Sequence, residues 1–322
     1  MKNILFKLTL ISTLIFLIIV SFSGCISNEN RLDSIPPDAV KMSPENDFYP
    51  PITHLDDWEQ PVPMPGPVNT AGAEDAPVIS QNADMFFFFF TPDVRVPPEQ
   101  QVRDGVTGIW WTKRIDDKWT EPERIILKYG LALDGPLCIN DNTLWFCSVR
   151  GGNFRELDIY TAELINEKWT NWKNAGERLN VDYLVGELYL TGDGNQMFFH
   201  KEDIDGFGGT DLYFIEKIDS EWSEPVNLGP IVNTENNEGW PYVSPDGKQL
   251  WFTSWSKKGY VGPAIFRTIK DEHNIWSEPE EVISNFAGDP GIDNEGNIYF
   301  THHFFNEEME MIEADIYVSY HK

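Results

Sequence analysis

The sequence predicts an all-β fold: a five-bladed β-propeller of four-stranded antiparallel blades, closed by a strand from the N-terminal side. An aromatic mark of the Asp-Ile-Tyr type recurs in steps of 50, 53, 53 and 51 residues, with its aromatic residue at Trp110, Tyr160, Tyr213, Phe266 and Tyr317. A regular period of this size indicates a repeat fold such as a propeller. Short β-rich runs separated by Gly, Pro, Asn and Asp support the all-β class, and no long helical pattern follows residue 25.

The clearest repeat unit lies between residues 238 and 254. Pro245-Asp246-Gly247-Lys248 has the composition of a tight turn, and Leu250 to Thr253 is an aromatic, β-rich run, so the two sides form a hairpin. A third strand over Ala264 to Thr268 and a fourth around Trp276 complete one blade. The matching second strands of the other blades are Met85 to Phe90, Leu144 to Cys147, Met197 to His200, and Ile298 to Thr301.

The fifth blade lacks its own tryptophan strand, because the sequence ends soon after Tyr317. The segment Asp57-Trp58-Glu59-Gln60-Pro61 resembles Glu221-Trp222-Ser223-Glu224-Pro225 of the third blade. We therefore expect the N-terminal segment to supply the outer strand of the last blade. Closing the ring in this way removes the exposed sheet edges that an open array would leave.

The first 25 residues have the composition of an export signal. Lys2 and Lys7 precede an apolar run from Leu8 to Phe22, and Ser23-Gly24-Cys25 follows. This pattern is similar to a lipoprotein processing site, with Cys25 as the lipidated residue. Phe22 stands where such sites usually have Leu, so an uncleaved membrane anchor is the alternative. Both place the rest of the chain on the extracytoplasmic side of the cell membrane.

Three regions follow from these observations: a signal or anchor at 1–25, a disordered Pro-rich spacer at 26–57, and the propeller at 58–322. Cys138 and Cys147 fall in two strands of one predicted hairpin. They form either a cross-strand disulfide or two buried free thiols.

The net charge of -28 argues against nucleic acid as a partner. An acidic surface repels phosphate, and the sequence has no basic stripe of the kind that DNA- or RNA-binding proteins carry. Solubility outside the cytoplasm is the simplest reason for so acidic a protein.

Three stretches resemble the WD40-like propeller repeat of TolB-type and other envelope-associated proteins. They are Val243 to Lys248 with Leu250-Trp251-Phe252, Gly206 to Tyr213, and Trp222 to Gly229. Blade 2 lacks the Pro-Asp-Gly turn, and blades 1 and 4 lack the Asp of Asp-Ile-Tyr. The resemblance implies a propeller of the cell envelope that contacts protein or glycan, and it implies no single reaction.

Candidate ligand-binding residues lie where the blades meet the propeller axis. Acids precede or begin the predicted innermost strands: Glu74, Asp75, Asp134, Glu187, Glu238 and Asp289. Their spacing from the strands puts them in two tiers rather than one ring. Bases and aromatic residues follow the second strands: Arg150, His200 with Lys201, Trp255, and His302 with His303. Such a mouth suits a sugar or a peptide, although acids at these positions also cap turns.

Two function classes remain. The favoured one is a non-enzymatic scaffold that binds a protein or glycan of the cell envelope. The alternative is a glycoside hydrolase or lyase similar to five-bladed arabinanase-like and invertase-like enzymes. That similarity implies Asp75 (or Glu74) as base or nucleophile, Asp134 as an orienting acid and Glu187 as proton donor. The sequence contains no motif for zinc, haem or nucleotide binding, and calcium is the ion that an acidic mouth would suit.

Overall fold

The computed structural model describes residues 30–128 and 130–322. The predicted signal or anchor, with Cys25, lies outside these residues. Arg31–Ser34 form a short 3-10 helix, η1. None of the helices in the described part of the chain is both long and apolar enough to cross a membrane.

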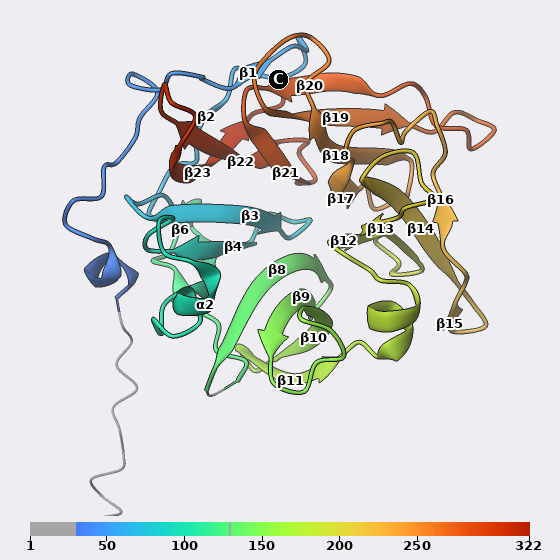
Figure 1. Ribbon diagram of the computed structural model, residues 1–322, viewed down its shortest axis with the longest axis horizontal. Helices are drawn as coiled ribbons and strands as arrows, with labels where there is room; N and C mark the ends of the chain where they lie inside the picture. Colours follow the sequence, from blue (N-terminus) through green and yellow to red (C-terminus); the bar gives the residue numbers. More distant parts are fainter. Residues whose placement is uncertain (1–29, 129) are drawn as a thin grey trace, which may run out of the picture. The chain divides into compact units, whose positions relative to one another are not determined.

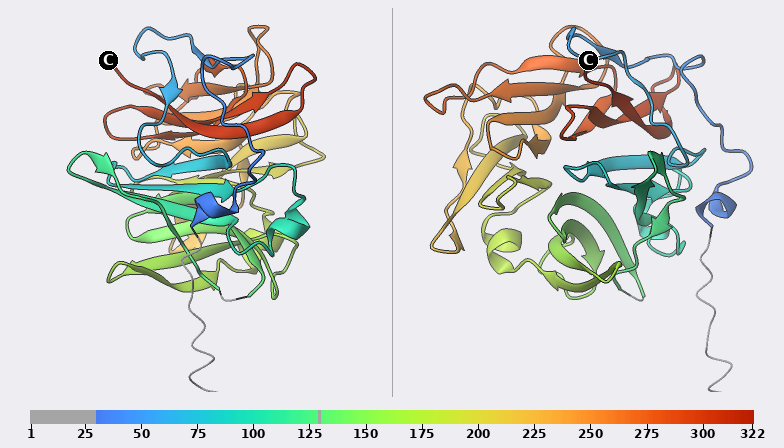
Figure 2. Two further views of the ribbon diagram at one scale, coloured as in Figure 1. Left: turned by 90° about the vertical axis from the view of Figure 1, so that its left-hand side faces the viewer. Right: turned by 180° about the vertical axis from the view of Figure 1, so that it is seen from behind.

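Residues 35–322 contain five antiparallel sheets arranged in a ring, which confirms the predicted five-bladed propeller (Figures 1 and 2). Blade 1 contains β3 (Ala73–Ile79), β4 (Met85–Thr91), β5 (Gly108–Ile115), β6 (Lys118–Trp119) and β7 (Glu123–Arg124). Blade 2 contains β8 (Ala132–Asn140), β9 (Thr143–Arg150), β10 (Asp158–Ile165) and β11 (Lys168–Asn174). Blade 3 contains β12 (Leu188–Leu190), β13 (Gln196–Glu202), β14 (Thr210–Ile218), β15 (Glu221–Trp222) and β16 (Val226–Asn227).

Blade 4 contains β17 (Gly239–Val243), β18 (Gln249–Trp255), β19 (Pro263–Ile269) and β20 (Glu280–Ser284). Blade 5 contains β21 (Ala287–Ile292), β22 (Ile298–Phe305) and β23 (Met311–Ser319). Two short strands before blade 1 complete these sheets: β1 (Ile52–Thr53) pairs with β20, and β2 (Val62–Pro63) pairs with β23. The connections carry two short helices, α2 (Pro98–Gln101) and the π-helix η2 (Arg178–Asp182).

The β17–β18 hairpin shows why the repeat folds as it does. Val243 pairs with Leu250, and Gly247 has a positive φ of 70° that the tight turn requires. The Ser244 hydroxyl donates to the Asp246 carboxylate at 2.6 Å, which stabilises the turn. Phe252 on β18 is buried and stacks against Phe266 of β19, so the aromatic run forms the core of the blade.

The predicted closure by the N-terminal segment is present. In β2, Val62 pairs with Val318 and Pro63 with Tyr317, and Trp58 forms an isolated bridge with His321. The outer strand of the last blade therefore comes from the other end of the propeller sequence, and the sheet edge of β23 is covered.

Trp58 is the main apolar contact of this closure. Its side chain is 5% exposed, and its ring meets that of Trp251 at 5.7 Å in an edge-to-face geometry. Its indole N–H donates to the carbonyl of Gly296 at 2.8 Å. The Arg267 guanidinium lies 5.1 Å from the Trp58 ring centre.

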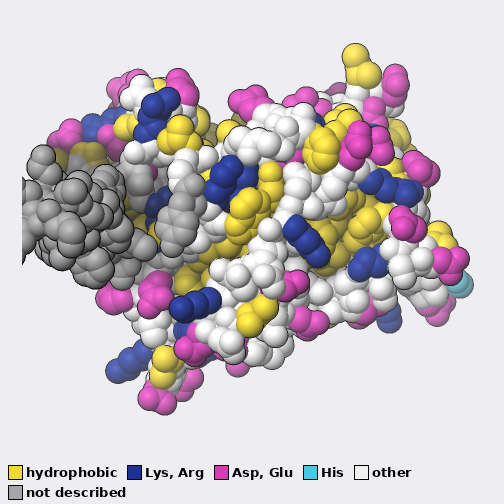
Figure 3. Space-filling view, turned by 90° about the horizontal axis from the view of Figure 1, so that it is seen from below, with side chains coloured by type: hydrophobic (Ala, Val, Ile, Leu, Met, Phe, Trp, Pro, Cys, Tyr) yellow, Lys and Arg dark blue, Asp and Glu magenta, His cyan; other side chains and the backbone are white. Residues whose placement is uncertain are grey.

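Basic side chains lie over tryptophan rings in other blades as well. Lys217 lies 4.9 Å from the ring centre of Trp222, and Lys270 lies 4.6 Å from that of Trp276. Lys and Arg beside hydrophobic side chains are also visible on the face shown in Figure 3. Some of the few basic side chains of this acidic protein therefore lie over tryptophan rings.

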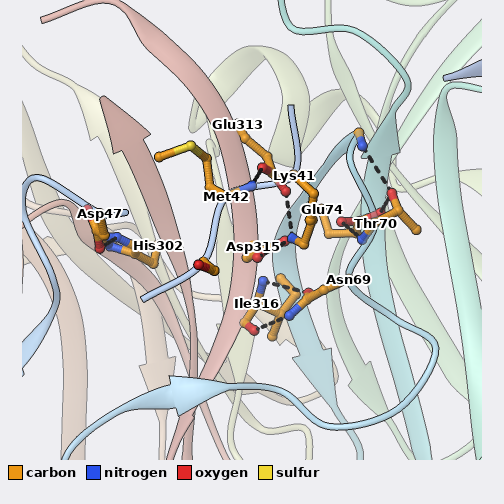
Figure 4. A network of polar contacts seen from close by, with 12 residues as sticks. Lys41, Met42, Asp47, Asn69, Thr70, Glu74, His302, Glu313, Asp315 and Ile316 are labelled. Carbon is orange, nitrogen blue, oxygen red and sulfur yellow. Dashed lines mark hydrogen bonds and ion pairs between the residues drawn. The ribbon is translucent and has the colours of Figure 1, made fainter. Parts of the chain in front are cut away.

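The segment from 35 to 57, which we call the strap, differs from the disordered spacer that we expected. Asp47 and His302 are bonded at 2.8 Å, and both side chains are almost completely buried. Lys41 binds Glu313 at 2.6 Å and also binds Asp315, while the neighbouring Met42 is buried (Figure 4). These contacts depend on individual residues, so no periodic apolar pattern in the sequence predicts them.

The acids of two Asp-Ile-Tyr marks stabilise turns. Asp158 accepts from the backbone N–H groups of Phe154 and Arg155, at 2.8 and 3.1 Å. Asp211 accepts in the same way from Phe207 and Gly208. In blade 5, Asp315 instead forms an ion pair with Lys41 of the strap.

Cys138 and Cys147 are both free thiols. Burial raises the pKa of Cys147 to about 12, with smaller effects from the charges of Glu187 and Asp134. Burial also raises the pKa of Cys138. Both thiols are therefore protonated and packed as small apolar groups.

We predict that Trp58→Ala destabilises the propeller by about 3–5 kcal/mol, because it removes a buried indole and weakens ring closure. Urea unfolding followed by fluorescence measures this change. Trp255→Ala is the matched control: Trp255 is 53% exposed, and its loss should change the free energy of unfolding by less than about 0.5 kcal/mol. Equal stability of the two variants would show that Trp58 does not hold the ring closed.

Candidate functional site

A bulge at or beside a proline interrupts the innermost strand of four blades. The prolines are Pro77, Pro136, Pro241 and Pro290, and each lies at a shift in strand register. In three of these bulges the residue before proline has a positive φ: 50° at Ala76, 51° at Trp240 and 54° at Asp289. Residues before proline usually avoid this conformation, so the surrounding ring must hold it in place.

These bulges surround a cavity that receives residues from the inner strand of every blade. Its lining includes Ala76, Pro136, Glu187, Trp240 and Asp289. The volume is about 40 Å³, which is room for roughly two or three water molecules. Of the predicted site residues, Glu187 and Asp289 line this narrow axial cavity.

Two of the predicted acids are used to cap loops. Glu74 accepts from the backbone N–H and hydroxyl of Thr70, at 2.9 and 2.6 Å. Glu238 accepts from the same two groups of Thr234, at 2.8 and 2.6 Å, and from the Ser254 hydroxyl. Both side chains are buried. These contacts correspond to the structural role that we considered for acids at such positions.

Asp134 and Arg150 neutralise each other away from the axial cavity. Asp134 accepts from the Ser148 hydroxyl at 2.6 Å and is bonded to the Arg150 guanidinium. Arg150 is buried and lies 4.6 and 4.8 Å from the ring centres of Tyr160 and Trp172. The pair therefore stabilises the packing of blade 2.

Three other acids, Asp75, Glu187 and Asp289, interact with one another, and we call them the axial acids. Asp75 accepts from the N–H of Ala76 at 2.8 Å, and the ring of His303 lies 3.9 Å away. One carboxylate oxygen of Asp289, Oδ1, is buried without a hydrogen-bond partner. An unpaired buried carboxylate oxygen is costly, so the site favours a proton or a positively charged group at this point.

The axial acids have different affinities for protons. Burial favours the neutral form of Asp75, but the nearby His303, Thr301 and the backbone N–H of Ala76 together outweigh burial and hold the pKa of Asp75 below its usual value. Burial, reinforced by the charge of Asp75, raises the pKa of Glu187 to about 8. Burial and the charges of Asp75 and Glu187 also raise the pKa of Asp289. Near neutral pH, Asp75 is therefore ionised, whereas Glu187 and Asp289 favour the protonated form.

Of the predicted bases and aromatic residues, His200 contacts Trp240, which lines the axial cavity. Its Nδ1 accepts from the backbone N–H of Trp240 at 3.3 Å, and burial lowers its pKa to about 4. Trp255 is exposed at the end of β18. His302 was expected at the mouth but is buried under the strap, because successive side chains of β22 point to opposite faces; His303 is the one that faces Asp75.

The proline bulges and the Asp75–His303 pair were not anticipated. A sequence signal for the bulges exists in the X-Pro dipeptides at 76–77, 135–136, 240–241 and 289–290. Within the described residues, no three His, Cys, Asp or Glu side chains are grouped so that they could hold a metal ion.

We predict that Glu187→Gln changes how stability depends on pH. The pKa of Glu187 in the folded protein is about 8, above its usual 4.5, so protonation stabilises the fold and this contribution is lost as pH rises from 4.5 to 8. Glutamine stays neutral, so the free energy of unfolding of the variant should exceed that of the wild type at pH 8 by a few kcal/mol, at most about 4, and should match it at pH 4.5.

Thermal unfolding at both pH values measures the effect. Glu167→Gln is the control, since the Glu167 side chain is 86% exposed. Parallel pH profiles of Glu187→Gln and the wild type would contradict the interaction among the axial acids.

Comparisons with known proteins show similarity at the level of three-dimensional structure. No family model matches the chain, and no curated protein matches it in sequence. Among solved structures, the α-L-arabinofuranosidase PaAbf62A from Podospora anserina is 15% identical, covers 81% of this chain and 95% of its own, and has a TM-score of 0.47. A putative TolB from Agrobacterium tumefaciens is 14% identical, covers 79% of this chain and 92% of its own, and has a TM-score of 0.45. The arabinanase Arb43A from Bacillus subtilis is 13% identical, covers 77% of this chain and 94% of its own, and has a TM-score of 0.42.

Proposed function

We propose that this protein is a binding propeller of the cell envelope, tethered on the extracytoplasmic side of the membrane, whose axial acids hold a positively charged group of a protein or glycan. The observation that carries the proposal is the group of three interacting acids Asp75, Glu187 and Asp289, in which one oxygen of Asp289 has no hydrogen-bond partner. A bound cation would supply a partner for that oxygen and would favour the ionised forms of Glu187 and Asp289.

The cavity lining favours a cationic group over a large neutral one. Trp240 is 40% exposed and lies in the same lining as Glu187 and Asp289. An aromatic face beside carboxylates attracts an ammonium or guanidinium group. The volume of about 40 Å³ admits the tip of such a group but not a sugar ring, since pockets that enclose small ligands usually measure about 300–1,000 Å³.

We expect trilysine to bind, with its Nε-acetylated form binding at least about tenfold more weakly, because acetylation removes the charge that the acids recognise. Isothermal titration calorimetry on the wild type and on Asp289→Asn measures this. A second pair of probes tests whether the charged group belongs to a glycan. It consists of triglucosamine, at a pH where its amines are charged, and neutral chitotriose. Calcium is tested as a competitor.

Equal binding of the charged and acetylated probes, or equal binding by wild type and Asp289→Asn, would overturn the axial proposal. Thr234→Ser is a suitable control variant, because it keeps the hydroxyl that Glu238 binds and leaves the cavity lining unchanged.

A glycoside hydrolase is the second candidate, favoured by the lowered pKa of Asp75 beside the raised pKa of Glu187. This division suits a base or nucleophile paired with a proton donor. Asp134, the third residue of the expected set, is engaged by Arg150 and Ser148, and Asp289 lies with the other two instead. Release of nitrophenol from a nitrophenyl arabinofuranoside by the wild type, but not by Glu187→Gln, would favour this candidate.

The membrane tether rests on the first 25 residues of the sequence. We predict that the wild type fractionates with membranes and that Cys25→Ser abolishes lipid attachment, because only the thiol can accept the lipid. Metabolic labelling with a fatty acid, followed by membrane fractionation, checks both points. Membrane fractionation of an unlabelled Cys25→Ser protein would identify the apolar run as an uncleaved anchor.

A further inference from the structure

Tryptophans in or near the outer strands lie at the junctions between neighbouring blades. Three of them pack against an aromatic residue on the second strand of the preceding blade. The ring centres are 5.5 Å apart for Trp169 and Phe87, 6.0 Å for Trp276 and Phe198, and 5.7 Å for Trp58 and Trp251. Three of the junctions are thus closed by one ring pair in the same position.

The junction between blades 5 and 1 is built differently. Trp119 of β6 lies 5.7 Å from Phe86 of its own blade, and Phe86 lies 5.6 Å from Tyr299, the second-strand aromatic of blade 5. Phe86 therefore stands between the two rings that pair directly elsewhere. The cross-strand partner of Tyr299 is Val318.

The residue paired with the second-strand aromatic also differs in size between the junctions. At the closed junctions the residues that correspond to Val318 are larger: Trp111, Phe214 and Arg267. The junction of blades 2 and 3 also has a small residue, Thr161, and there the hydroxyl of Tyr183, which follows η2, donates to the Trp222 carbonyl at 3.4 Å. At blades 5 and 1 a cavity of about 590 Å³ remains, which we call the junction cavity.

The junction cavity combines aromatic surfaces with polar groups of both signs. Trp119, Tyr299 and Tyr320 supply the rings. Arg114, Lys118, Asp117, Glu295 and Asn297 supply the polar groups. Arg114 and Asp117 already approach each other at 3.5 Å, so the charges largely offset one another. A ligand that carries a net charge gains little here, whereas one with many hydroxyl groups finds both donors and acceptors.

We propose that the junction cavity is a second binding site, for a neutral oligosaccharide. Its volume lies within the range of about 300–1,000 Å³ that is usual for small-ligand sites. Aromatic faces can cover the C–H faces of a sugar ring, while Glu295 accepts hydrogen bonds from hydroxyl groups and Lys118 donates to them. The site shares no lining residue with the axial cavity, so it stands independently of the proposed cation site.

Calorimetric titration with the neutral trisaccharides maltotriose, cellotriose and chitotriose tests this site. We expect at least one of them to bind, and Trp119→Ala to weaken that binding at least about tenfold. Trp276→Ala is the matched control, because it removes the equivalent tryptophan from a closed junction. Asp289→Asn should leave the binding unchanged, which separates this result from the axial test.

A second variant keeps the test valid if Trp119→Ala unfolds. Lys118→Ala combined with Glu295→Ala changes only the polar lining and should weaken binding of the same trisaccharide at least about tenfold. Failure of the wild type to bind any of the three sugars would overturn the proposal. So would equal losses in Trp119→Ala and Trp276→Ala, or unchanged affinity in the double variant.

Discussion

Closure of the ring is the constraint on which the rest of this structure depends. The axial cavity is lined by the inner strands of all five blades, so it exists only while the fifth blade is joined to the first. The outer strand that completes blade 5 contributes only two residues, Val62–Pro63. The side chain of Trp58 therefore adds what a short strand cannot supply: a buried ring, a hydrogen bond to Gly296 and a contact with Arg267.

The fold was predictable because its determinants repeat. Aromatic residues recur at the same place in each blade, so five weak signals with one period define the number of blades. The strap was not predictable in the same way. Its order depends on single contacts, such as Asp47 with His302, between residues that are 255 positions apart in the sequence. Nothing in the local composition of the strap distinguishes it from a solvated linker.

The candidate site was predictable in composition but not in geometry. The acids were found because they precede the innermost strands, yet neighbours such as Glu74 and Asp75 have opposite roles: one caps a loop and the other meets His303. A side chain changes face with every residue of a strand, and a bulge resets that alternation. An alignment of repeats with an error of one residue therefore exchanges the structural acids for the axial ones.

The same alternation connects the strap with the axial acids. His302 and His303 are adjacent on β22, and their side chains point to opposite sides of the strand: His302 to Asp47 of the strap and His303 to Asp75. The strap therefore fixes the backbone that positions the partner of the ionised axial acid. Lys41 strengthens this attachment at Glu313 and Asp315 on the neighbouring strand β23 (Figure 4). The segment that follows the predicted anchor is thus part of the framework of the proposed binding site, and a spacer without structure would not provide that support.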